Sequence, residues 1–229
     1  GDFHLIVLAP NSVQEMHDFV ADAFELAFKY RNPAMILADG CIGQMMEKVV
    51  LAPQRPRKTK EEIAAECKSW ALIGKTDDRE RNVITSLELK SEVMEVNNQR
   101  LQAKYKAINE NEVRYEANQC DDAEYVIVAF GSSSRICSAT VEMARAEGIK
   151  LGLLRPITLY PFPTKAIAAL AERGVKGFLS AELNAGQMVE DVRLAVNGKA
   201  PVEHFGRMGG MLFSPDEVLK AVKEKLINR

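Results

Sequence analysis

The second half of the chain alternates short apolar runs with segments of helical pattern, and this alternation constrains the fold more than any other feature of the sequence. Strands are expected at residues 125–130, 149–154, 175–182 and 201–205, and helices at 133–147, 164–173, 186–196 and from 215 onward. Gly148 and Gly174 end the first two helices, because glycine readily adopts the left-handed conformation that closes a helix. Strands that alternate with helices pair in parallel and carry helices on both faces. We therefore predict an open α/β domain with a parallel sheet at residues 121–229.

The first 50 residues predict a strand–helix–strand unit, with apolar runs at 5–8 and 34–38. Ser12 and Glu15 match a capping box, in which each side chain bonds the other residue's backbone amide. The helix that follows carries one apolar stripe, expected to face the core: Val13, Met16, Val20, Phe24 and Ala27. Two apolar strands and one helix leave most of a parallel sheet uncovered. We expect companion strands in residues that precede Gly1 in the full gene product. The alternative is that these strands join the edge of the later sheet.

Residues 51–120 have the composition of a connector between these two regions. Prolines and charges mark an exposed start, whereas residues 86–118 lack proline and glycine and predict one long helix or two in tandem. Apolar residues recur there every seven positions, at Leu87, Met94, Leu101, Ile108 and Tyr115. The positions that would complete a coiled-coil seam are polar. We therefore expect this seam to pack against its own or a neighbouring subunit.

Composition excludes several functional classes. The formal net charge of -2 provides no field that would attract nucleic acid. No run of about 18 apolar residues predicts a membrane span, and the opening Gly1-Asp2-Phe3-His4 does not resemble a signal peptide. The four cysteines form no CxxC pair, which argues against an iron–sulfur cluster, a zinc ribbon or a redox dithiol on this chain. Scattered thiols favour a cytoplasmic location.

The loop Gly131-Ser132-Ser133-Ser134-Arg135 follows a predicted strand, where open parallel sheets bind ligands. It keeps one of the three glycines of a dinucleotide fingerprint, which argues against a nicotinamide-binding protein. We expect its serines to cap the next helix, with anion binding as the less favoured alternative. The sequence also contains no HExxH, GxSxG or P-loop motif.

Two further loops have the character of contact surfaces. Residues 155–163 include three prolines and two aromatic residues, and predict a stiff apolar surface segment suited to an interface. Residues 182–188 place Glu182 and Asn184 at a strand end, where they could hydrogen-bond a backbone or a partner. A single carboxylate without a nearby acid or base is weak support for acid–base catalysis.

These same segments carry a family resemblance over nearly the whole chain. Residues 8–15, 23–27 and 30–33, followed by Asp39 and Gly43-Gln44-Met45, resemble the pyrimidine-binding domain of 2-oxoacid:ferredoxin oxidoreductases. Residues 155–163 and 182–188 and the pair Gly209-Gly210 are similar to the transketolase C-terminal-like domain of that family. The resemblance is to the C-terminal portion of the α subunit in the 2-ketoisovalerate or 2-oxoglutarate branch.

The resemblance implies a domain organisation. Residues 1–50 would be the end of a thiamine-diphosphate pyrimidine-binding domain, 51–120 a helical linker, and 121–229 a transketolase C-terminal-like α/β domain with a parallel sheet. It also implies oxidative decarboxylation of a 2-oxoacid such as 2-ketoisovalerate to an acyl-CoA, with reduction of ferredoxin.

The departures from the family pattern imply that the chain is incomplete as an enzyme. No residue matches the glutamate that activates thiamine, and Ala38-Asp39-Gly40 lacks the first glycine of the metal–diphosphate motif. Thiamine diphosphate, Mg²⁺ and iron–sulfur clusters are therefore expected in the assembled complex, and none on this chain alone. We expect no catalytic and no metal-ligating residue here, and no tight thiamine diphosphate binding by the isolated chain.

The resemblance also implies site residues and partners. Asp39, Gly43 and Gln44 are expected near the shared cofactor site, or equally in a loop that only fixes the linker. Expected interface residues are Arg155, Thr158, Tyr160, Phe162, Glu182, Asn184 and Gln187. The expected partners are thiamine-diphosphate-binding and iron–sulfur subunits, with a homodimer left open. Ferredoxin and coenzyme A would bind the complex, and neither nucleic acid nor membrane is expected.

Two other functions remain open from the sequence. One is a component of a transketolase or a 2-oxoacid dehydrogenase, which uses a similar terminal domain. The other is a non-catalytic assembly module with the same fold.

Overall fold

The computed structural model describes residues 3–54 and 56–228. The chain divides into two compact units, of which the larger combines Gly1–Val50 with Tyr105–Arg229 and the smaller is Leu51–Lys104. The larger unit contains two β-sheets and most of the helices.

The main sheet of the larger unit has five strands, in the order β3-β5-β4-β7-β8. Its strands are β3 (Tyr115–Asn118), β4 (Tyr125–Val128), β5 (Leu151–Pro156), β7 (Gly177–Glu182) and β8 (Val202–Gly206). The last four strands are parallel, which confirms the predicted α/β class, whereas β3 runs antiparallel along the β5 edge.

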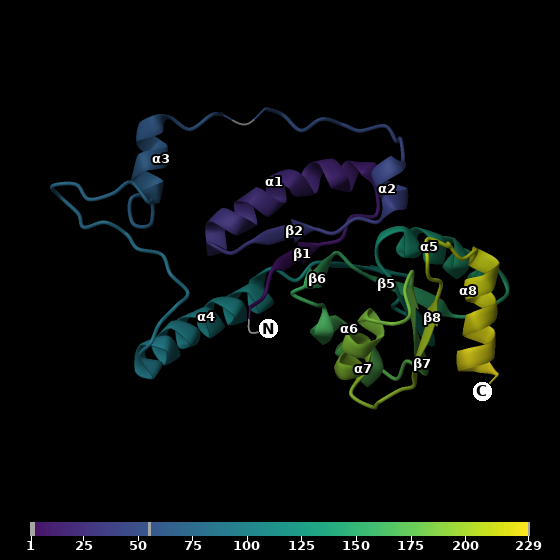
Figure 1. Cartoon of the computed structure of the whole chain (residues 1–229). Helices are drawn as coiled ribbons and strands as arrows, with labels where there is room; N and C mark the ends of the chain where they lie inside the picture. Colours follow the sequence, from purple (N-terminus) through teal and green to yellow (C-terminus); the bar gives the residue numbers. More distant parts are fainter. Residues whose placement is uncertain (1–2, 55, 229) are drawn as a thin grey trace. The chain divides into compact units, whose positions relative to one another are not determined.

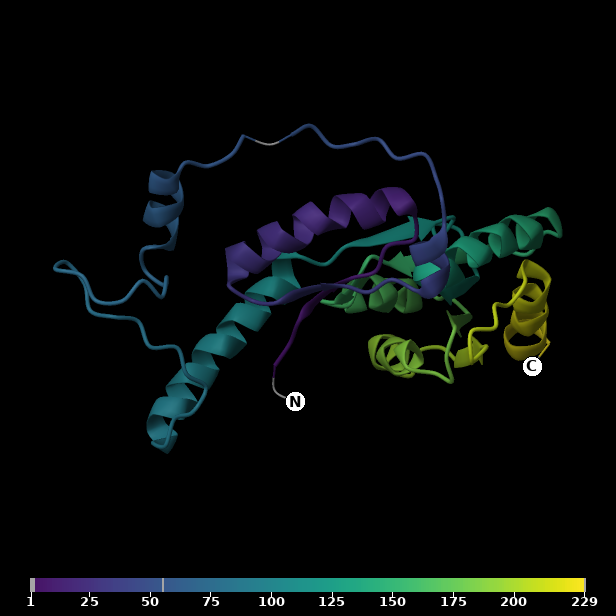
Figure 2. The same cartoon turned by 45° about the horizontal axis from the view of Figure 1, so that its top comes forward.

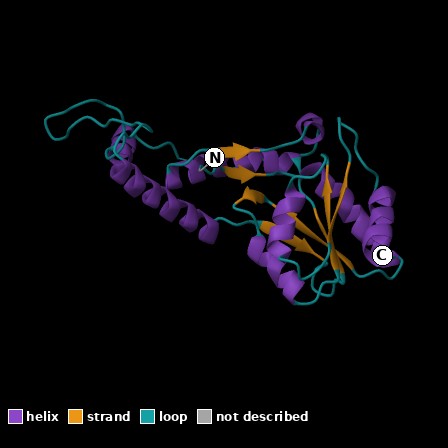
Figure 3. Ribbon diagram, turned by 60° about the horizontal axis from the view of Figure 1, so that its bottom comes forward, coloured by secondary structure: helices purple, strands orange, loops and turns teal. Residues whose placement is uncertain are grey.

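Helices cover both faces of this sheet, as Figure 3 shows with strands in orange and helices in purple. They are α5 (Gly131–Ala146), α6 (Thr164–Glu172), α7 (Met188–Val196) and α8 (Pro215–Val222), which continues as the π-helix η1 (Lys223–Ile227). Ile127 on β4 packs in one core with α5 and α8, whereas its neighbours Val126 and Val128 pack in a second core with α6 and α7. Successive side chains of a strand point to opposite faces, so a strand with apolar residues at every position needs a helical layer on each side.

The opening segment forms a separate three-stranded sheet in the order β2-β1-β6. β1 (Ile6–Leu8) and β2 (Ala34–Ile36) are parallel, and β6 (Thr158–Tyr160) adds to β1 in the antiparallel direction. The alternative that these strands join the edge of the later sheet is therefore wrong. Helix α1 (Val13–Tyr30) connects β1 to β2 and lies along them in both Figure 1 and Figure 2.

β2 forms one edge of this small sheet and pairs, within the described residues, with β1 alone. Met35 and Leu37 beside this edge are 41% and 44% exposed. An apolar strand with a free edge invites another strand. The companion strands expected from the sequence stay a prediction.

The segment at residues 155–163 differs from the stiff exposed loop that its prolines predicted. Arg155 and Pro156 end β5, the next residues form β6, and Pro161 and Pro163 are buried. The reason is that the chain here leaves the main sheet and enters the small one, so it passes between two cores rather than over the surface.

The predicted helix at 86–118 is shorter in the structure. The helices of the connector are α3 (Lys60–Cys67) and α4 (Ser91–Asn111), so Leu87 lies before α4 and Tyr115 lies in β3. Residues after α4 become a strand because they pair with β5, from Tyr115 opposite Pro156 to Asn118 opposite Leu153. Tertiary pairing thus overrides local helical propensity.

Among the described helices, none combines the length and apolar composition that crossing a bilayer requires.

The main sheet makes a testable prediction at Gly152 on β5. A Cβ atom there would lie 2.9 Å from the Gln119 carbonyl oxygen and 3.1 Å from the Cys120 Cα, which are both backbone atoms. We expect Gly152→Ala to lower the free energy of unfolding by about 2 kcal/mol, because backbone must move to admit the methyl group.

The matched control is Gly43→Ala, since no atom lies within 4 Å of a Cβ built at this helical glycine. Alanine there should be neutral or stabilise by up to about 1 kcal/mol. Urea unfolding of both variants measures the difference, and equal free energies would contradict the packing argument.

Candidate functional site

Asp39, at the end of the segment that follows β2, holds the first turns of two helices. Its Oδ1 accepts from the Ile42 amide at 3.0 Å and so caps α2 (Gly40–Gln44). The same carboxylate accepts from the Ser132 amide at 2.9 Å and the Ser132 hydroxyl at 2.8 Å, at the start of α5. A carboxylate at a helix N-terminus satisfies free amides and complements the helix dipole. Asp39 therefore joins the opening segment to the main domain.

This arrangement corrects the prediction that the serines of residues 131–135 cap α5. The N-cap residue is Phe130, which has no capping side chain, and the Ser134 hydroxyl donates to the Gly131 carbonyl. Gly131 has a φ of +57°, and a Cβ built there would lie 3.0 Å from Asp39 Oδ2. The glycine thus allows the carboxylate to approach the helix.

Burial by itself raises the pKa of Asp39, but hydrogen bonds from the Ile42 amide and from Ser132 outweigh it. The pKa of Asp39 therefore lies below its ordinary value, because these donors stabilise the charged form.

Glu182 plays the same role for α7 at the end of β7. Its side chain is buried, and the carboxylate accepts from the amides of Gln187 (3.0 Å), Met188 (2.8 Å) and Val189 (2.9 Å). It also accepts from the Ser180 hydroxyl at 2.8 Å. Burial raises the pKa of Glu182, but these hydrogen bonds outweigh it and the pKa lies below its ordinary value.

The two capping carboxylates border one pocket of about 220 Å³ at the carboxyl ends of β2, β4 and β7. Asn184 also lines it, and its Oδ1 accepts from the Gly186 amide at 2.7 Å. The structure therefore brings together Asp39, predicted near the cofactor, and the predicted interface residues Glu182 and Asn184. The residues that line this pocket include no histidine, cysteine or lysine, so the pocket supplies neither a nucleophile nor a general base of those types.

The residues of this pocket do not fit a Mg²⁺–diphosphate group. Such a group needs oxygen ligands for the metal and free donors for the phosphates. Both oxygens of Asp39 and of Glu182 already accept hydrogen bonds, and Asp39 occupies the N-terminus of α5. Within the described residues, no cluster of three histidine, cysteine or acidic side chains could hold a metal.

Gly43 and Gln44 lie on α2 next to this pocket in sequence but do not line it. Both residues are exposed, and the space above Gly43 is open. Their contact with a cofactor stays a prediction.

Arg155 on β5 holds the first turn of α1. Its side chain is 3% exposed, and it bonds both oxygens of Glu15, one of them at 3.0 Å. It also bonds Glu116 at 2.9 Å and the Ala9 carbonyl at 3.3 Å. Arginine suits this position because its planar guanidinium engages a carboxylate through two parallel bonds.

Sequence reasoning assigned Arg155 to an interface but missed Glu15 as its partner. Only half of the predicted capping box at Ser12 forms: the Ser12 hydroxyl accepts from the Glu15 amide at 3.2 Å, but the Glu15 carboxylate accepts from the Asn11 amide instead. No local signal reveals the pairing with Arg155, since the two residues are 140 positions apart.

The other predicted interface residues have separate surroundings. Thr158 Oγ1 accepts from the Arg114 amide at 3.0 Å, and the Tyr160 ring stacks on His4 at 4.6 Å. Phe162 packs against the core beneath α6 and α7, and the Gln187 side chain is exposed. Thr158 and Tyr160, like Arg155, therefore contact other segments of this chain. Contact with a partner subunit stays a prediction for all seven.

Helix α1 presents a charged row to the rest of the unit. Glu15, Asp22 and Lys29 recur every seven residues and pair with Arg155, with Arg114 at 2.6 Å and with Glu112 at 2.6 Å, respectively. Residues seven apart lie on one helix face, so this face is turned inward.

Of the apolar stripe that was predicted to face the core, Val13, Met16 and Ala27 are half-buried, but the prediction was wrong for the other two residues. Val20 and Phe24 are 48% and 66% exposed, and Phe28 one turn further is 54% exposed. The buried apolar residues of α1 are instead Phe19 and Leu26, beside the charged row. We call Val20, Phe24 and Phe28 the outer face of α1.

Two family models match the chain. The model described as "Pyruvate flavodoxin/ferredoxin oxidoreductase, thiamine diP-bdg" matches residues 1–116, and "Pyruvate:ferredoxin oxidoreductase core domain II" matches residues 123–218.

Similar proteins include two subunits from Methanothermobacter marburgensis. The ketoisovalerate oxidoreductase subunit VorB is 48% identical over 224 residues, which are 98% of this chain and 61% of VorB. The 2-oxoglutarate synthase subunit KorA is 32% identical, over 97% of this chain and 64% of KorA. The chain thus spans less than two thirds of the length of these relatives.

Two solved structures share the fold. The 2-oxoglutarate:ferredoxin oxidoreductase from Magnetococcus marinus superposes with a TM-score of 0.74 and 21% identity, over 98% of this chain and 42% of that one. A split-gene transketolase superposes with a TM-score of 0.53 and 14% identity, over 96% and 56% of the two chains.

Glu182 yields a prediction with a pH dependence. We expect Glu182→Gln to lower the free energy of unfolding at pH 7 by about 2 kcal/mol, because an amide cannot accept all the buried hydrogen bonds. Since the pKa of Glu182 is depressed in the folded state, the contribution of its carboxylate is fully present above about pH 4.5 and is lost as the pH falls through the folded pKa.

The difference between Glu182→Gln and the native chain should therefore shrink in acid. Urea unfolding at pH 7 and at about pH 3 measures it. Glu190→Gln, at an exposed position on the same helix, is the control and should change stability by less than about 0.5 kcal/mol. If Glu182→Gln lowered the free energy of unfolding equally at both pH values, the role of the charge would be contradicted.

The Arg155–Glu15 pair predicts strong coupling in a double-mutant cycle. Arg155→Met should lower the free energy of unfolding by about 3 kcal/mol, because it leaves carboxylates without their partner. Combined with Glu15→Gln, the loss should be smaller than the sum by about 1–2 kcal/mol.

The exposed pair Lys176–Glu124 is the control for this cycle, with side chains 59% and 41% exposed. Its coupling should stay below about 1 kcal/mol. Equal coupling in the two cycles would show that Arg155 does not hold α1.

Proposed function

Because this chain belongs to the pyruvate flavodoxin/ferredoxin oxidoreductase family, we propose that it is part of one subunit of a thiamine-diphosphate-dependent 2-oxoacid:ferredoxin oxidoreductase. The complex would oxidatively decarboxylate 2-ketoisovalerate to an acyl-CoA and reduce ferredoxin. The observation that carries this proposal is the 48% identity with a ketoisovalerate oxidoreductase subunit over 98% of the chain. Identity with 2-oxoglutarate synthase subunits is lower, at 32% or less, which favours the branched substrate.

The chain would act with other subunits that complete the catalytic centre. The carboxylates of Asp39 and Glu182 are already used by helix caps, so thiamine diphosphate and Mg²⁺ would be held mainly by residues that do not belong to this chain. Asp39, Gly43 and Gln44 would border that shared site.

Iron–sulfur clusters would belong to a different subunit. Cluster ligands are thiolates, but Cys120 and Cys137 are buried thiols, and burial raises the pKa of Cys120 to about 11 and that of Cys137 further still. Cys41 and Cys67 are 26 positions apart in sequence, unlike the short spacings of cluster motifs. Free thiols suit a cytoplasmic location for the complex.

The surfaces of the larger unit support a role within an assembly. The free edge of β2 would accept companion strands of the thiamine-binding domain, which extend a sheet in its own plane. Val20, Phe24 and Phe28 on the outer face of α1 are exposed although α1 packs on β1 and β2, so strands added in the plane of that sheet would not bury them. A second layer would have to do so, and another subunit of the oxidoreductase would provide it.

A chimaera tests this proposal. This chain would replace the matching part of VorB, co-expressed with the other subunits of the M. marburgensis ketoisovalerate oxidoreductase. We expect an assembled complex that oxidises 2-ketoisovalerate with reduction of ferredoxin, measured by co-purification and by a ferredoxin-linked assay. Assembly with activity only toward another 2-oxoacid would overturn the substrate assignment, and failure to assemble would overturn the subunit assignment.

Variants of the outer face of α1 test, in the same co-expression experiment, whether this face binds the partner subunits. Phe24→Asp together with Phe28→Asp should abolish co-purification of the partner subunits, whereas Leu194→Asp, at a 76% exposed position on α7, should not.

Calorimetric titration of thiamine diphosphate into the isolated chain should show no micromolar binding. Micromolar binding would mean that this chain carries the cofactor site by itself.

A further inference from the structure

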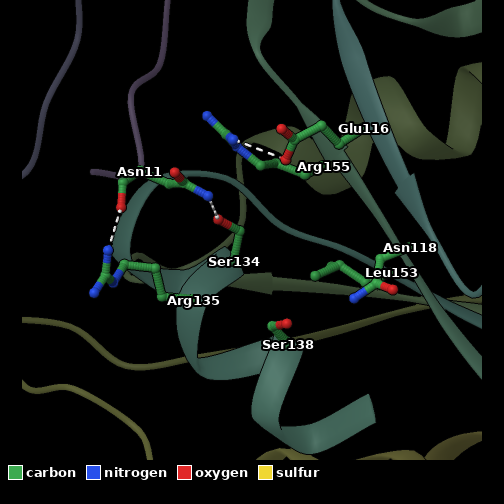
Figure 4. A pocket seen from close by; sticks show the side chains of 8 residues that line it. All are labelled: Asn11, Glu116, Asn118, Ser134, Arg135, Ser138, Leu153 and Arg155. Atoms are coloured by element: carbon green, nitrogen blue, oxygen red, sulfur yellow. Dashed lines mark hydrogen bonds and ion pairs between the residues drawn. The ribbon is translucent and has the colours of Figure 1, made fainter. Parts of the chain in front are cut away.

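A second pocket, of about 330 Å³, shares none of its lining residues with the pocket of the capping carboxylates. It is formed by Asn11 before α1, the first half of α5, and the paired strands β3 and β5 (Figure 4). These elements come from both family-model regions, 1–116 and 123–218. Ligand pockets are favoured at such junctions, and this volume suits a small molecule.

Three exposed or half-buried polar side chains around this pocket have hydrogen-bonding capacity that the described chain does not use, and the buried Arg155 Nε has no hydrogen-bond partner either. The Asn118 amide and the Ser138 hydroxyl make no hydrogen bond to another described side chain or backbone group, and Glu116 uses only Oε2, which accepts from Arg155. Figure 4 shows Glu116, Asn118 and Ser138 on different sides of one space. Free donors and a free carboxylate oxygen therefore face the same volume.

The charges around the pocket argue against a simple anion as ligand. Arg135 pairs with Glu47 at 2.8 Å, and Arg155 pairs with both Glu15 and Glu116. These two guanidinium groups are thus matched by three carboxylates, so a phosphate would meet no surplus of positive charge. A ligand with a positive group for Glu116 and a negative group for the neutral donors balances the pocket.

We propose that this pocket binds a small zwitterionic α-amino acid. Its ammonium group would donate to Glu116 Oε1, and its carboxylate would accept from the Ser138 hydroxyl and the Asn118 amide. Leu153, the one apolar residue among those that line the pocket, would contact a short aliphatic side chain. A ligand held in this way contacts strand β3 and helix α5 together, and so would stabilise the junction between the two family regions.

Calorimetric titration of the purified chain with three related compounds tests the site. L-valine carries both charged groups, isobutylamine lacks the carboxylate, and 2-ketoisovalerate (3-methyl-2-oxobutanoate) lacks the ammonium group. We expect saturable binding of L-valine, and at least about tenfold weaker binding of each analogue, since each loses one charged partner. Absence of saturable L-valine binding, or equal binding of either analogue, would overturn the proposal.

Variants then locate the binding within the pocket. Asn118→Ala and Ser138→Ala remove side chains that make no hydrogen bond to the rest of the described chain, so the fold should be kept and L-valine affinity should fall about threefold to tenfold. Glu116→Gln should lower the affinity for L-valine more than the affinity for the analogue that lacks the ammonium group. Glu172→Gln, at an exposed carboxylate paired with Lys199, is the control and should bind like the native chain. Unchanged affinity in the three pocket variants would place any binding elsewhere.

Discussion

The ion pair between the buried Arg155 and the half-buried Glu15 is the constraint on which the larger unit depends. It joins β5 of the main sheet to the first turn of α1, and so fixes the small sheet against the domain that follows it. Removing a guanidinium from water costs several kcal/mol, which only well-aligned partners can offset. The two terminal nitrogens of Arg155 have such partners in Glu15, Glu116 and the Ala9 carbonyl, whereas its buried Nε has none among the described residues. The same contacts place Asn11 beside α5, and thereby form the wall of the polar pocket.

At the carboxyl ends of the strands in both sheets, side-chain carboxylates of the chain itself cap the N-termini of the neighbouring helices. Asp39 serves α2 and α5, and Glu182 serves α7. In many α/β proteins these N-termini bind phosphate groups. Here the positive ends of α5 and α7 are already neutralised. The edge is therefore suited to holding segments of the chain in position, in keeping with the proposal that the chain borders a cofactor site rather than containing it.

Helix α1 turns charged side chains toward the rest of the chain and apolar side chains outward, whereas a surface helix of an isolated domain usually does the reverse. Its charges at Glu15, Asp22 and Lys29 face the chain, and Val20, Phe24 and Phe28 face outward. A helix of this kind is stable in an assembly, where both sides are covered. The physical character of this one helix thus supports the proposal that the chain functions within a larger complex.

The sequence by itself determined the features that depend on a few neighbouring residues. Ser214 and Glu217, three positions apart, form a capping box at the start of α8, and Gly148 and Gly174 close helices with positive φ as predicted. The apolar runs at 125–130 and 175–182 contain the strands β4 and β7 because their residues can be buried on both faces. Only the tertiary structure decided the contacts of Asp39 with Ser132, 93 positions away, and of Arg155 with Glu15. It also decided which side of α1 faces the core. Local sequence fixes the periodicity of a helix, but the direction of each face depends on what lies beside it, and for α1 that is a row of charges from distant segments.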